Sequence, residues 1–510
     1  MLSIYDQGPP PPCPNPFNLA AHVLAEADAH PDKLALAIIG LNNAERWSYA
    51  RLQAAVLGTA SGLRDMGLAP GDIALLRLGN SVEFPIAYLG AIAAGLVPVP
   101  TSSQLTAREV AKIAADLSPR AVFLGDGIAC PDLPGVAMID EAALTAMRDL
   151  PPAAYDMGDP DRIAYIVYTS GTSGNSRAVA HAHRAIWARQ MMHVGWYGLT
   201  SEDRLCHAGA FNWTYTLGTG LMDPWSVGAT ALIPAAGVDP QALPLLLKRH
   251  EATVFAAAPG VYRKILNHHA KIDLPQLRHG LTAGEKISDA LRAEWNAAAG
   301  GKLYEAFGMS ECSTFISGSP TTPARPGMLG APQVGRRVAI VDADGTPVPM
   351  GEIGIIAVAR RDPGLMLGYI GAEAETAARM RGEWFLTGDL GRMEPDGQIA
   401  YQGRDDDMMN AGGYRVSPLE VEAALSDIGG ISEIGVTDVE VKTDARLIWA
   451  FYTGPEPLDE KALQRIAGER LARYKQPRGF QYLPELPRNP NGKLKRRALA
   501  PLWQASDAAS

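Results

Sequence analysis

The sequence predicts an α/β protein with more than one domain. Its 510 residues are about three times the usual length of a single domain. In the first part of the chain, helical patterns rich in Ala and Leu alternate with short apolar strands, which is typical of α/β folds with largely parallel sheets. After Gly327 the pattern changes to short strands separated by Asp-Gly turns, and a further change follows Gly403.

Expected helices and strands alternate in the N-terminal part of the chain. Its expected helices cover residues 19–29, 51–66 and 82–94. Its expected strands cover residues 34–38, 73–76, 121–124, 164–168, 230–233, 254–257 and 277–282. Because each strand is short, apolar and bounded by polar or Gly-containing segments, we expect buried parallel sheets.

The next part is expected to be a β-rich subdomain. Apolar strands are predicted at 338–342, 354–359 and 398–401, and the dipeptides Asp344-Gly345 and Asp396-Gly397 lie between strands. Asp-Gly favours the tight turns of antiparallel hairpins.

The C-terminal part begins after a charged stretch, Arg404-Asp405-Asp406-Asp407. Here Ser417 is a predicted helix N-cap, Pro418 occupies the first helical position and Glu420 completes a capping box. We therefore expect a large N-terminal domain up to residue 403 and a smaller α+β domain of about 100 residues, an ordinary domain size.

Composition restricts the class of protein. The net charge is −9 and there is no long basic run outside the C-terminal end, which disfavours nucleic acid as a partner. The four cysteines are scattered, which indicates ordinary thiols in a reducing compartment. The N-terminus lacks the pattern of a signal peptide, and the apolar stretches are shorter than a membrane span. We expect a cytoplasmic protein without a membrane span.

The most informative segment is a loop dense in Gly, Ser and Thr that follows a predicted strand. It contains Thr169, Ser170, Gly171, Thr172, Ser173 and Gly174, with Arg177 at its far end. Backbone N–H groups, hydroxyls and a nearby cation are what a triphosphate requires. The segment is not a Walker A loop, and on composition alone a polar surface loop explains it equally well.

Four further segments contain residues that could contact a nucleotide or a metal ion. They are Tyr304-Glu305-Ala306-Phe307-Gly308-Met309-Ser310-Glu311, Thr387-Gly388-Asp389-Leu390-Gly391, Gly403-Arg404-Asp405-Asp406 and Asn489-Pro490-Asn491-Gly492-Lys493-Leu494-Lys495. The first suits stacking of a flat base and binding of a divalent metal, and the others place a carboxylate, a cation and a lysine near turns. Taken singly, each is better explained by an ordinary turn or a solvated charge.

In this order and spacing, the five segments resemble the adenylate-forming superfamily of acyl-CoA synthetases, peptide-synthetase adenylation domains and luciferases. The resemblance covers about residues 17 to 497. It implies a large N-terminal domain of two α/β sheets plus a β-barrel, residues 1–403, joined through a hinge at 404–406 to a small mobile domain, residues 407–510. It also implies ATP, Mg²⁺ and CoA as ligands, and an acyl-adenylate as the intermediate.

The resemblance assigns roles residue by residue. The loop 169–174 with Arg177 would bind phosphates, Glu311 would bind magnesium, and Ser310 would touch a phosphate. The adenine pocket would use Gly284, Glu285, Glu305, Ala306, Phe307 and Gly308, and the ribose would be held by Asp389 and Arg404. Lys493 would be the catalytic lysine, Asp406 the hinge, and Gly412, Gly413 and Tyr414 the loop that meets the pantetheine arm of CoA.

Two positions depart from the family pattern. Arg177 replaces the usual lysine, which keeps the charge and changes its geometry. Ser310 replaces the usual threonine and keeps its hydroxyl.

The segment around Phe211, Trp213 and Tyr215 resembles the benzoate-CoA ligase branch. If this segment is extended, the three aromatic side chains share one face and suit a flat apolar acid. Gly284 and Gly308 would complete that pocket, and an aromatic or compact acid is the expected substrate.

Several alternatives remain open at this point. A medium-chain fatty acid is the second substrate, a carrier protein could replace CoA as the thiol, and a protein that only binds nucleotide is a third hypothesis. The context of Lys493 also resembles that of acetylated bacterial acyl-CoA synthetases, which implies a lysine acetyltransferase and deacetylase as partners. A homodimer is an alternative assembly that the sequence does not decide.

Overall fold

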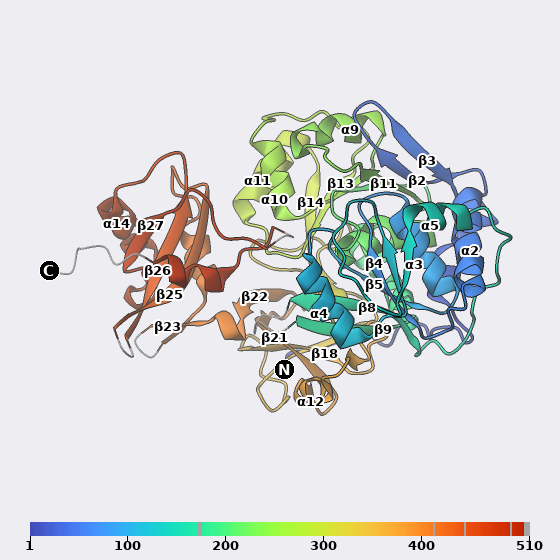
Figure 1. The fold of residues 1–510 in the computed structure, drawn as a ribbon. Helices are drawn as coiled ribbons and strands as arrows, with labels where there is room; N and C mark the ends of the chain where they lie inside the picture. Colours follow the sequence, from blue (N-terminus) through green and yellow to red (C-terminus); the bar gives the residue numbers. More distant parts are fainter. Residues whose placement is uncertain (171–175, 412–413, 443–444, 490–491, 504–510) are drawn as a thin grey trace.

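The computed structural model describes residues 1–170, 176–411, 414–442, 445–489 and 492–503. It shows a mixed α/β architecture, in which the red C-terminal elements lie beside the rest of the chain (Figure 1). The predicted fold class is confirmed. In the described part of the chain, no helix is both long and apolar enough to cross a membrane.

The largest sheet has nine strands, and its central pairs are parallel. Antiparallel strands occur at its two edges. In sheet order the strands are β16 (Ala331–Pro332), β15 (Ser313–Ser317), β14 (Lys302–Met309), β13 (His279–Ala283), β12 (Val254–Ala256), β10 (Arg204–His207), β11 (Thr230–Pro234), β2 (Leu34–Ile39) and β3 (Ala44–Ser48). The carboxyl ends of parallel strands meet at one edge, so the segments after β10, β13 and β14 converge there.

A second, four-stranded sheet is entirely parallel. Its order is β5 (Val97–Pro100), β4 (Ile73–Arg77), β6 (Ala121–Leu124) and β7 (Ala137–Asp140). A third sheet joins β8 (Ile163–Ser170) to β9 (Ser176–Ala182) and β19 (Gly368–Tyr369). Because β8 and β9 are antiparallel neighbours, Thr169 lies opposite Arg177 at the ends of the loop that they flank.

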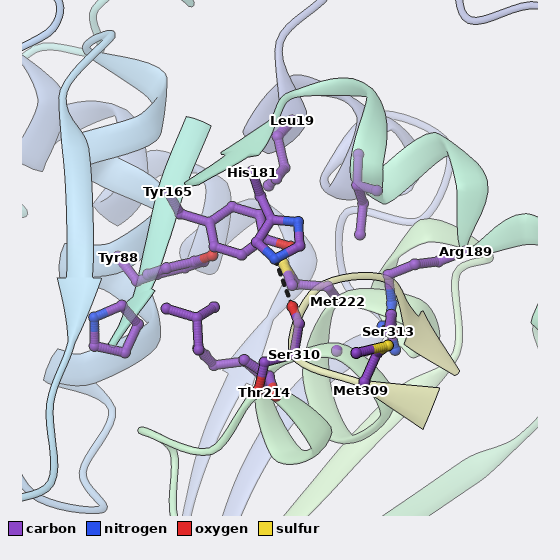
Figure 2. A pocket seen from close by; sticks show the side chains of 15 residues that line it. Leu19, Tyr88, Tyr165, His181, Arg189, Thr214, Met222, Met309, Ser310 and Ser313 are labelled. Carbon is purple, nitrogen blue, oxygen red and sulfur yellow. Dashed lines mark hydrogen bonds between the residues drawn. The ribbon is translucent and has the colours of Figure 1, made fainter. Parts of the chain in front are cut away.

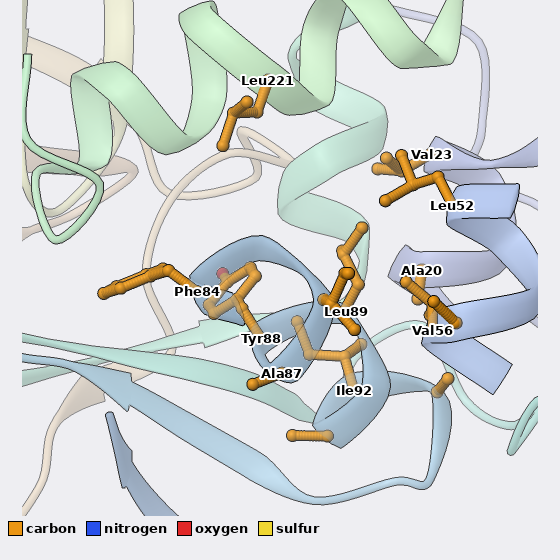
Figure 3. Close-up of a cluster of buried hydrophobic side chains, with 14 of the residues drawn as sticks. Ala20, Val23, Leu52, Val56, Phe84, Ala87, Tyr88, Leu89, Ile92 and Leu221 are labelled. Atoms are coloured by element: carbon orange, nitrogen blue, oxygen red, sulfur yellow. The ribbon is translucent and has the colours of Figure 1, made fainter. Parts of the chain in front are cut away.

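The helix α3 (Glu83–Ala93) is apolar on all sides and lies at the centre of the N-terminal core (Figure 3). Such a helix is stable only when every face is covered. It packs against α2 (Tyr49–Asp65) and α1 (Leu19–Val23). Gly90 permits the close approach of α2, because a Cβ at this position would lie 2.8 Å from the Thr59 side chain.

The other helices cover the sheets. They are α4 (Ala107–Leu117), α5 (Glu141–Met147), α6 (Arg184–Ala188), α7 (Gln190–Met192), α8 (Asp223–Ser226), α9 (Leu243–Arg249), α10 (Pro259–Leu266), α11 (Asp289–Ala299) and α12 (Glu373–Ala378). The π-helix η3 (Thr216–Met222) lies between β10 and α8.

The β-rich subdomain is an antiparallel sheet, and both predicted hairpins are present. Its order is β1 (Ile4–Asp6), β17 (Arg337–Val341), β18 (Ile353–Ala359), β21 (Trp384–Met393) and β20 (Met380–Arg381), and β22 (Ile399–Arg404) also pairs with β21. Among the described residues these pairings do not close on themselves. In place of the expected β-barrel, the described strands form an open sheet, in which β1 does not pair with β20 or β22.

The C-terminal part has its own cores, built from residues after Met409. Its elements are β23 (Met409–Ala411), β24 (Tyr414–Val416), α13 (Pro418–Leu425), β25 (Glu433–Lys442), β26 (Ala445–Thr453), α14 (Glu460–Arg470) and β27 (Gly479–Tyr482). The predicted start of α13 is confirmed, because the Ser417 hydroxyl accepts a hydrogen bond from the Glu420 N–H. The Glu420 side chain itself pairs with Lys475.

Candidate functional site

The predicted phosphate loop lies at the hairpin between β8 and β9. Thr169 and Ser170 end β8, whereas Gly171, Thr172, Ser173 and Gly174 lie outside the described residues. Arg177 is the second residue of β9, and its Nε donates to Glu375 on α12. Its guanidinium also lies 5.4 Å from the centre of the Tyr369 ring. The cation is thus oriented by two residues that sequence reasoning did not identify.

Glu311 follows β14 and is partly exposed. Its Oε1 accepts a hydrogen bond of 2.6 Å from the Tyr369 hydroxyl. Within the described ranges, no group of three or more His, Cys, Asp or Glu residues could enclose a metal. A single accessible carboxylate fits Mg²⁺, which takes one or two protein carboxylates and completes its shell with phosphates and water. Glu311 would be that ligand.

Ser310 and Glu311 lie on a turn that is held by a hydrogen bond from β9. His181 on β9 forms a hydrogen bond of 2.7 Å with the Ser310 carbonyl oxygen. Burial lowers the pKa of His181 to about 4, so this imidazole is neutral at pH 7.

Asp389 and Arg404 are brought together by antiparallel pairing of β21 and β22. The carboxylate Oδ2 lies 3.6 Å from Arg404 Nη1, and Oδ1 accepts a 2.8 Å hydrogen bond from the Tyr401 hydroxyl. Asp389 is almost fully buried. The two residues that are expected to hold the ribose thus form an ion pair, and Tyr401 is a third member of this group that the sequence did not reveal.

The predicted adenine wall follows β14. Phe307 packs on Tyr401, with ring centres 5.4 Å apart, and Ala306 and Gly308 flank it on the strand. Gly308 is required by packing, because a Cβ there would lie 2.2 Å from the Ser313 carbonyl oxygen. The aromatic face and the small residues suit a flat base.

Glu305 does not present a carboxylate to this wall. It is buried, and its two oxygens accept hydrogen bonds from the Ile287 N–H at 3.1 Å and from Arg292 Nη2 at 3.0 Å. The side chain therefore braces the segment after β13, and only its backbone remains for the expected pocket.

Gly284 and Glu285 follow β13 at the same sheet edge. Gly284 has φ +93°, and a Cβ here would lie 2.9 Å from the Trp213 ring, so both backbone and packing require glycine. Burial raises the pKa of the Glu285 carboxyl, and the cations Arg488 and Lys493 oppose that effect.

Lys493 lies on an exposed turn of the C-terminal domain, and Arg488, at the base of that turn, lies 3.7 Å from Glu285. The Lys493 N–H donates to Asn489 Oδ1 at 2.8 Å, and its carbonyl accepts from the Asn489 N–H at 2.8 Å. The turn thus brings the lysine to the N-terminal domain beside the predicted adenine pocket.

The aromatic segment is not extended, so the expectation of a shared extended face is wrong. Phe211 packs against Phe84 in the N-terminal core, whereas Trp213 lies in a bend and Tyr215 lies in the helical stretch that follows and continues into η3. The helical stretch packs against β10 and β11 of the nine-stranded sheet. The three residues therefore divide between two clusters.

Trp213 and Tyr215 form an aromatic cage with His207, which ends β10. Tyr215 lies 5.0 Å from Trp213 and 4.4 Å from His207 between ring centres. His207 is fully buried, neither ring nitrogen has a hydrogen-bond partner in the structure, and burial lowers its pKa to about 3. Sequence reasoning assigned His207 no role. Its place at the carboxyl end of a parallel strand is the signal that points to a site.

A separate cavity has Thr214, from the same helical stretch, in its lining (Figure 2). Arg189, Ser313, His181 and Tyr88 line it, and Arg189 donates to both oxygens of the buried Asp223. Its volume of about 30 Å³ holds about two water molecules. This cavity is too small for an acid substrate, and water would satisfy the unpaired Tyr88 hydroxyl and His181 Nδ1.

Four predicted residues remain, Asp406, Gly412, Gly413 and Tyr414. Asp406 is in the short helix η5 (Asp405–Asp407), directly after β22. Gly412 and Gly413 lie outside the described residues, and Tyr414 begins β24.

The described residues bring together the ends of the β8–β9 hairpin, an accessible carboxylate, a paired Asp and Arg, an aromatic wall and a lysine turn from the C-terminal part of the chain. This set of groups fits an enzyme that binds a nucleoside triphosphate. Residues 23–370 match the family described as AMP-binding enzyme, and residues 420–493 match its C-terminal domain. The chain belongs to this family of adenylate-forming enzymes and is an AMP-forming acyl- or aryl-CoA synthetase that uses ATP and CoA.

Relatives of known activity cover nearly the whole chain. It is 29% identical to 3-hydroxybenzoate–CoA ligase of Aromatoleum sp. (strain CIB), over 92% of this chain and 94% of that one. It is 28% identical to the mitochondrial acyl-coenzyme A synthetase ACSM3 of Pongo abelii, over 95% and 89%.

Solved structures of CoA ligases are similar to this chain over nearly its whole length. The anthranilate CoA ligase AuaEII with anthranoyl-AMP has a TM-score of 0.87 at 26% identity, over 96% of this chain and 98% of that one. A benzoate CoA ligase of Burkholderia xenovorans LB400 has a TM-score of 0.84 at 26% identity, over 95% and 100%.

Proposed function

We propose that this enzyme activates an aromatic carboxylic acid and transfers it to CoA. The observation that carries the proposal is the cage of His207, Trp213 and Tyr215 against Gly284, at the sheet edge that also carries Gly308. Flat rings pack well against such faces. The similarity to ligases named for 3-hydroxybenzoate, anthranilate and benzoate supports the same class of acid.

In the first half-reaction, a carboxylate oxygen of the acid attacks the α-phosphorus of ATP, and the bond to the β-phosphate bridging oxygen breaks. Pyrophosphate leaves and an acyl-adenylate remains. The protein contributes position and charge. Asp389 and Arg404 hold the ribose, the aromatic wall at Phe307 holds the base, and Lys493 stabilises the charge that develops on the α-phosphate.

Glu311, held by Tyr369, is our proposed magnesium ligand. When bound, Mg²⁺ supplies charge neutralisation at the phosphates. The loop 169–174 and Arg177 would surround the phosphate oxygens, and Ser310 would add a hydroxyl.

In the second half-reaction, the thiol sulfur of CoA attacks the acyl carbon, the bond to the AMP oxygen breaks, and the thiol proton is released. We place the domains at 1–403 and 407–510, with the hinge at 404–406 around Asp406. Rotation about this hinge would withdraw Lys493 and bring in Gly412, Gly413 and Tyr414 to meet the pantetheine arm. We expect a cytoplasmic enzyme.

A pyrophosphate-release screen tests the substrate class. The panel contains benzoate, hydroxybenzoates, aminobenzoates, cyclohexane carboxylate and linear acids of medium length, each with and without CoA. We expect the aromatic acids to give the highest kcat/KM and to yield a CoA thioester. Preference for the linear acids would support the medium-chain alternative, and pyrophosphate without thioester would support a carrier protein as acceptor.

A further inference from the structure

A chain of charged side chains crosses between the two domains beside the catalytic lysine turn. Arg263, on α10 of the N-terminal domain, donates to Oε1 of Glu433 at the start of β25. The same oxygen accepts a 2.8 Å hydrogen bond from Arg488 Nη2. Arg488 Nη1 lies 3.7 Å from Oε1 of Glu285, back on the N-terminal domain. Charges of opposite sign alternate, and two of the three contacts join different domains.

Arg488 also shapes the turn itself. Its Nη1 donates to the carbonyl oxygen of Gly492, the residue before Lys493. Arg488 forms an antiparallel bridge with Leu494, and the Gly492 N–H donates to the Asn489 carbonyl at 2.8 Å. One guanidinium therefore contacts the lysine turn and both acids of the charge chain.

We propose that Arg488 is a positioning residue for adenylation, which holds the Lys493 turn in shape and, through Glu285 and the Glu433–Arg263 pair, fixes it against the N-terminal domain. The inference rests on the proposed two-step function, because it assigns these contacts to the first half-reaction alone. Arg263 and Glu433 act through Arg488 and are not expected to contact substrate.

Partial burial of these groups strengthens their electrostatic contacts. The four side chains are only 20% to 34% exposed, so water screens them less than it screens surface pairs. Burial raises the pKa of Glu285 and disfavours its carboxylate, and the facing cations, Arg488 first, act in the opposite direction. When the C-terminal domain turns away, the contacts between domains must break. They therefore favour one orientation over the other.

Separate assays of the two half-reactions test the proposal. Adenylation is measured as pyrophosphate exchange with the acid, and thioester formation is measured from preformed acyl-adenylate and CoA. In Arg488→Ala we expect adenylation to fall by about 10-fold to 100-fold, as for a misplaced catalytic group. Thioester formation should stay within about twofold, because Lys493 takes no part in it.

Two further variants separate positioning from simple stability. Arg263→Ala removes the N-terminal anchor without touching the turn and should lower adenylation by about threefold to tenfold. Arg488→Lys restores one charge without the fork that reaches several partners, so it should recover only part of the rate. The effect of Arg263→Ala should disappear when Glu433 is already replaced by Gln.

Arg446→Ala is the matched control. Arg446 pairs with Asp438 at 2.8 Å within the C-terminal hairpin of β25 and β26, away from the domain boundary. This variant should leave both half-reactions unchanged.

Equal losses in both half-reactions of Arg488→Ala, or no loss in either, would overturn the positioning role. Failure of the proposed function has a different result, because a Lys493→Ala enzyme would then form adenylate at the wild-type rate.

Discussion

Lys493 is the residue on which the two half-reactions should differ most. In Lys493→Ala we expect adenylate formation to fall by about 100-fold to 1,000-fold, the usual cost of removing one group that stabilises transition-state charge. Thioester formation from a preformed acyl-adenylate should remain near the wild-type rate. Rapid-quench assays of each half-reaction measure both quantities. An equal loss in the two assays contradicts the assignment.

Arg177 allows a test of the unusual end of the phosphate loop. Arg177→Ala should raise the KM for ATP by about tenfold, as expected for a lost hydrogen bond to a charged group, and Arg177→Lys should be close to wild type. Steady-state kinetics at saturating acid measure the change. Glu375→Gln should raise KM less than Arg177→Ala does, because it removes one of the two groups that orient Arg177 and leaves the positive charge in place. If Arg177→Ala matches wild type, the surface-loop interpretation is favoured.

Exposure of Lys493 makes it accessible to a modifying enzyme. We expect acetylation at Lys493 to abolish adenylation, because it removes the positive charge that the first step needs. Incubation with a lysine acetyltransferase and acetyl-CoA, followed by mass spectrometry and a pyrophosphate assay, tests this, and a deacetylase should restore activity. The prediction fails if Lys495 is modified instead, or if the acetylated enzyme still releases pyrophosphate.

At the scale of elements, the short helix η5 connects the β-rich subdomain to the C-terminal domain. Asp406→Pro fixes φ near −65° at this hinge and should trap one orientation. We expect adenylation to survive and thioester formation to fall by about tenfold or more, because only the second step needs the rotated domain. Asp406→Ala keeps the backbone free and should affect neither step. Wild-type rates of both steps in Asp406→Pro would refute the hinge assignment.

Packing between elements also explains two errors of sequence reasoning. Aromatic residues occur at every second position of this segment, which suggests a strand. Tyr215 nevertheless lies in a helical stretch, which continues into η3 and packs against β10 and β11. Glu305 belongs to a motif typical of an adenine pocket, yet Arg292 on α11 binds its carboxylate. In both cases a partner distant in the chain decides where the side chain points.

For the whole molecule, buried histidines predict a loss of stability in mild acid. Burial lowers the pKa of His181 to about 4 and of His183 and His207 to about 3, whereas an unfolded imidazole titrates near its usual value of about 6.5. The unfolded chain therefore binds more protons below that value. The contribution of these neutral histidines to the free energy of unfolding is fully present above pH 6.5. It falls as the pH is lowered, by about 2 kcal/mol for each such histidine at pH 5.

Urea unfolding at pH 7 and pH 5 measures this slope. His183→Gln should reduce it, because glutamine cannot gain a proton and still offers an acceptor to the Leu19 N–H that His183 Nδ1 now accepts at 2.9 Å. Replacement of the exposed His268 by Gln is the control and should leave the slope unchanged. A free energy of unfolding that does not fall between pH 7 and pH 5 contradicts the prediction.

The sequence by itself determined the α/β class, the antiparallel hairpins at the Asp-Gly turns, the start of α13 at Ser417, and the family with its ATP and CoA chemistry. These features are local: turn residues, caps and motifs such as Thr387-Gly388-Asp389 act within a few neighbouring residues, so they can be read along the chain. Only the tertiary structure decided that the β-rich sheet is open, that His207 joins the aromatic cage, and that Arg263, Glu433, Arg488 and Glu285 meet beside Lys493. Those contacts join residues far apart in the chain, and their geometry depends on how whole elements and domains pack.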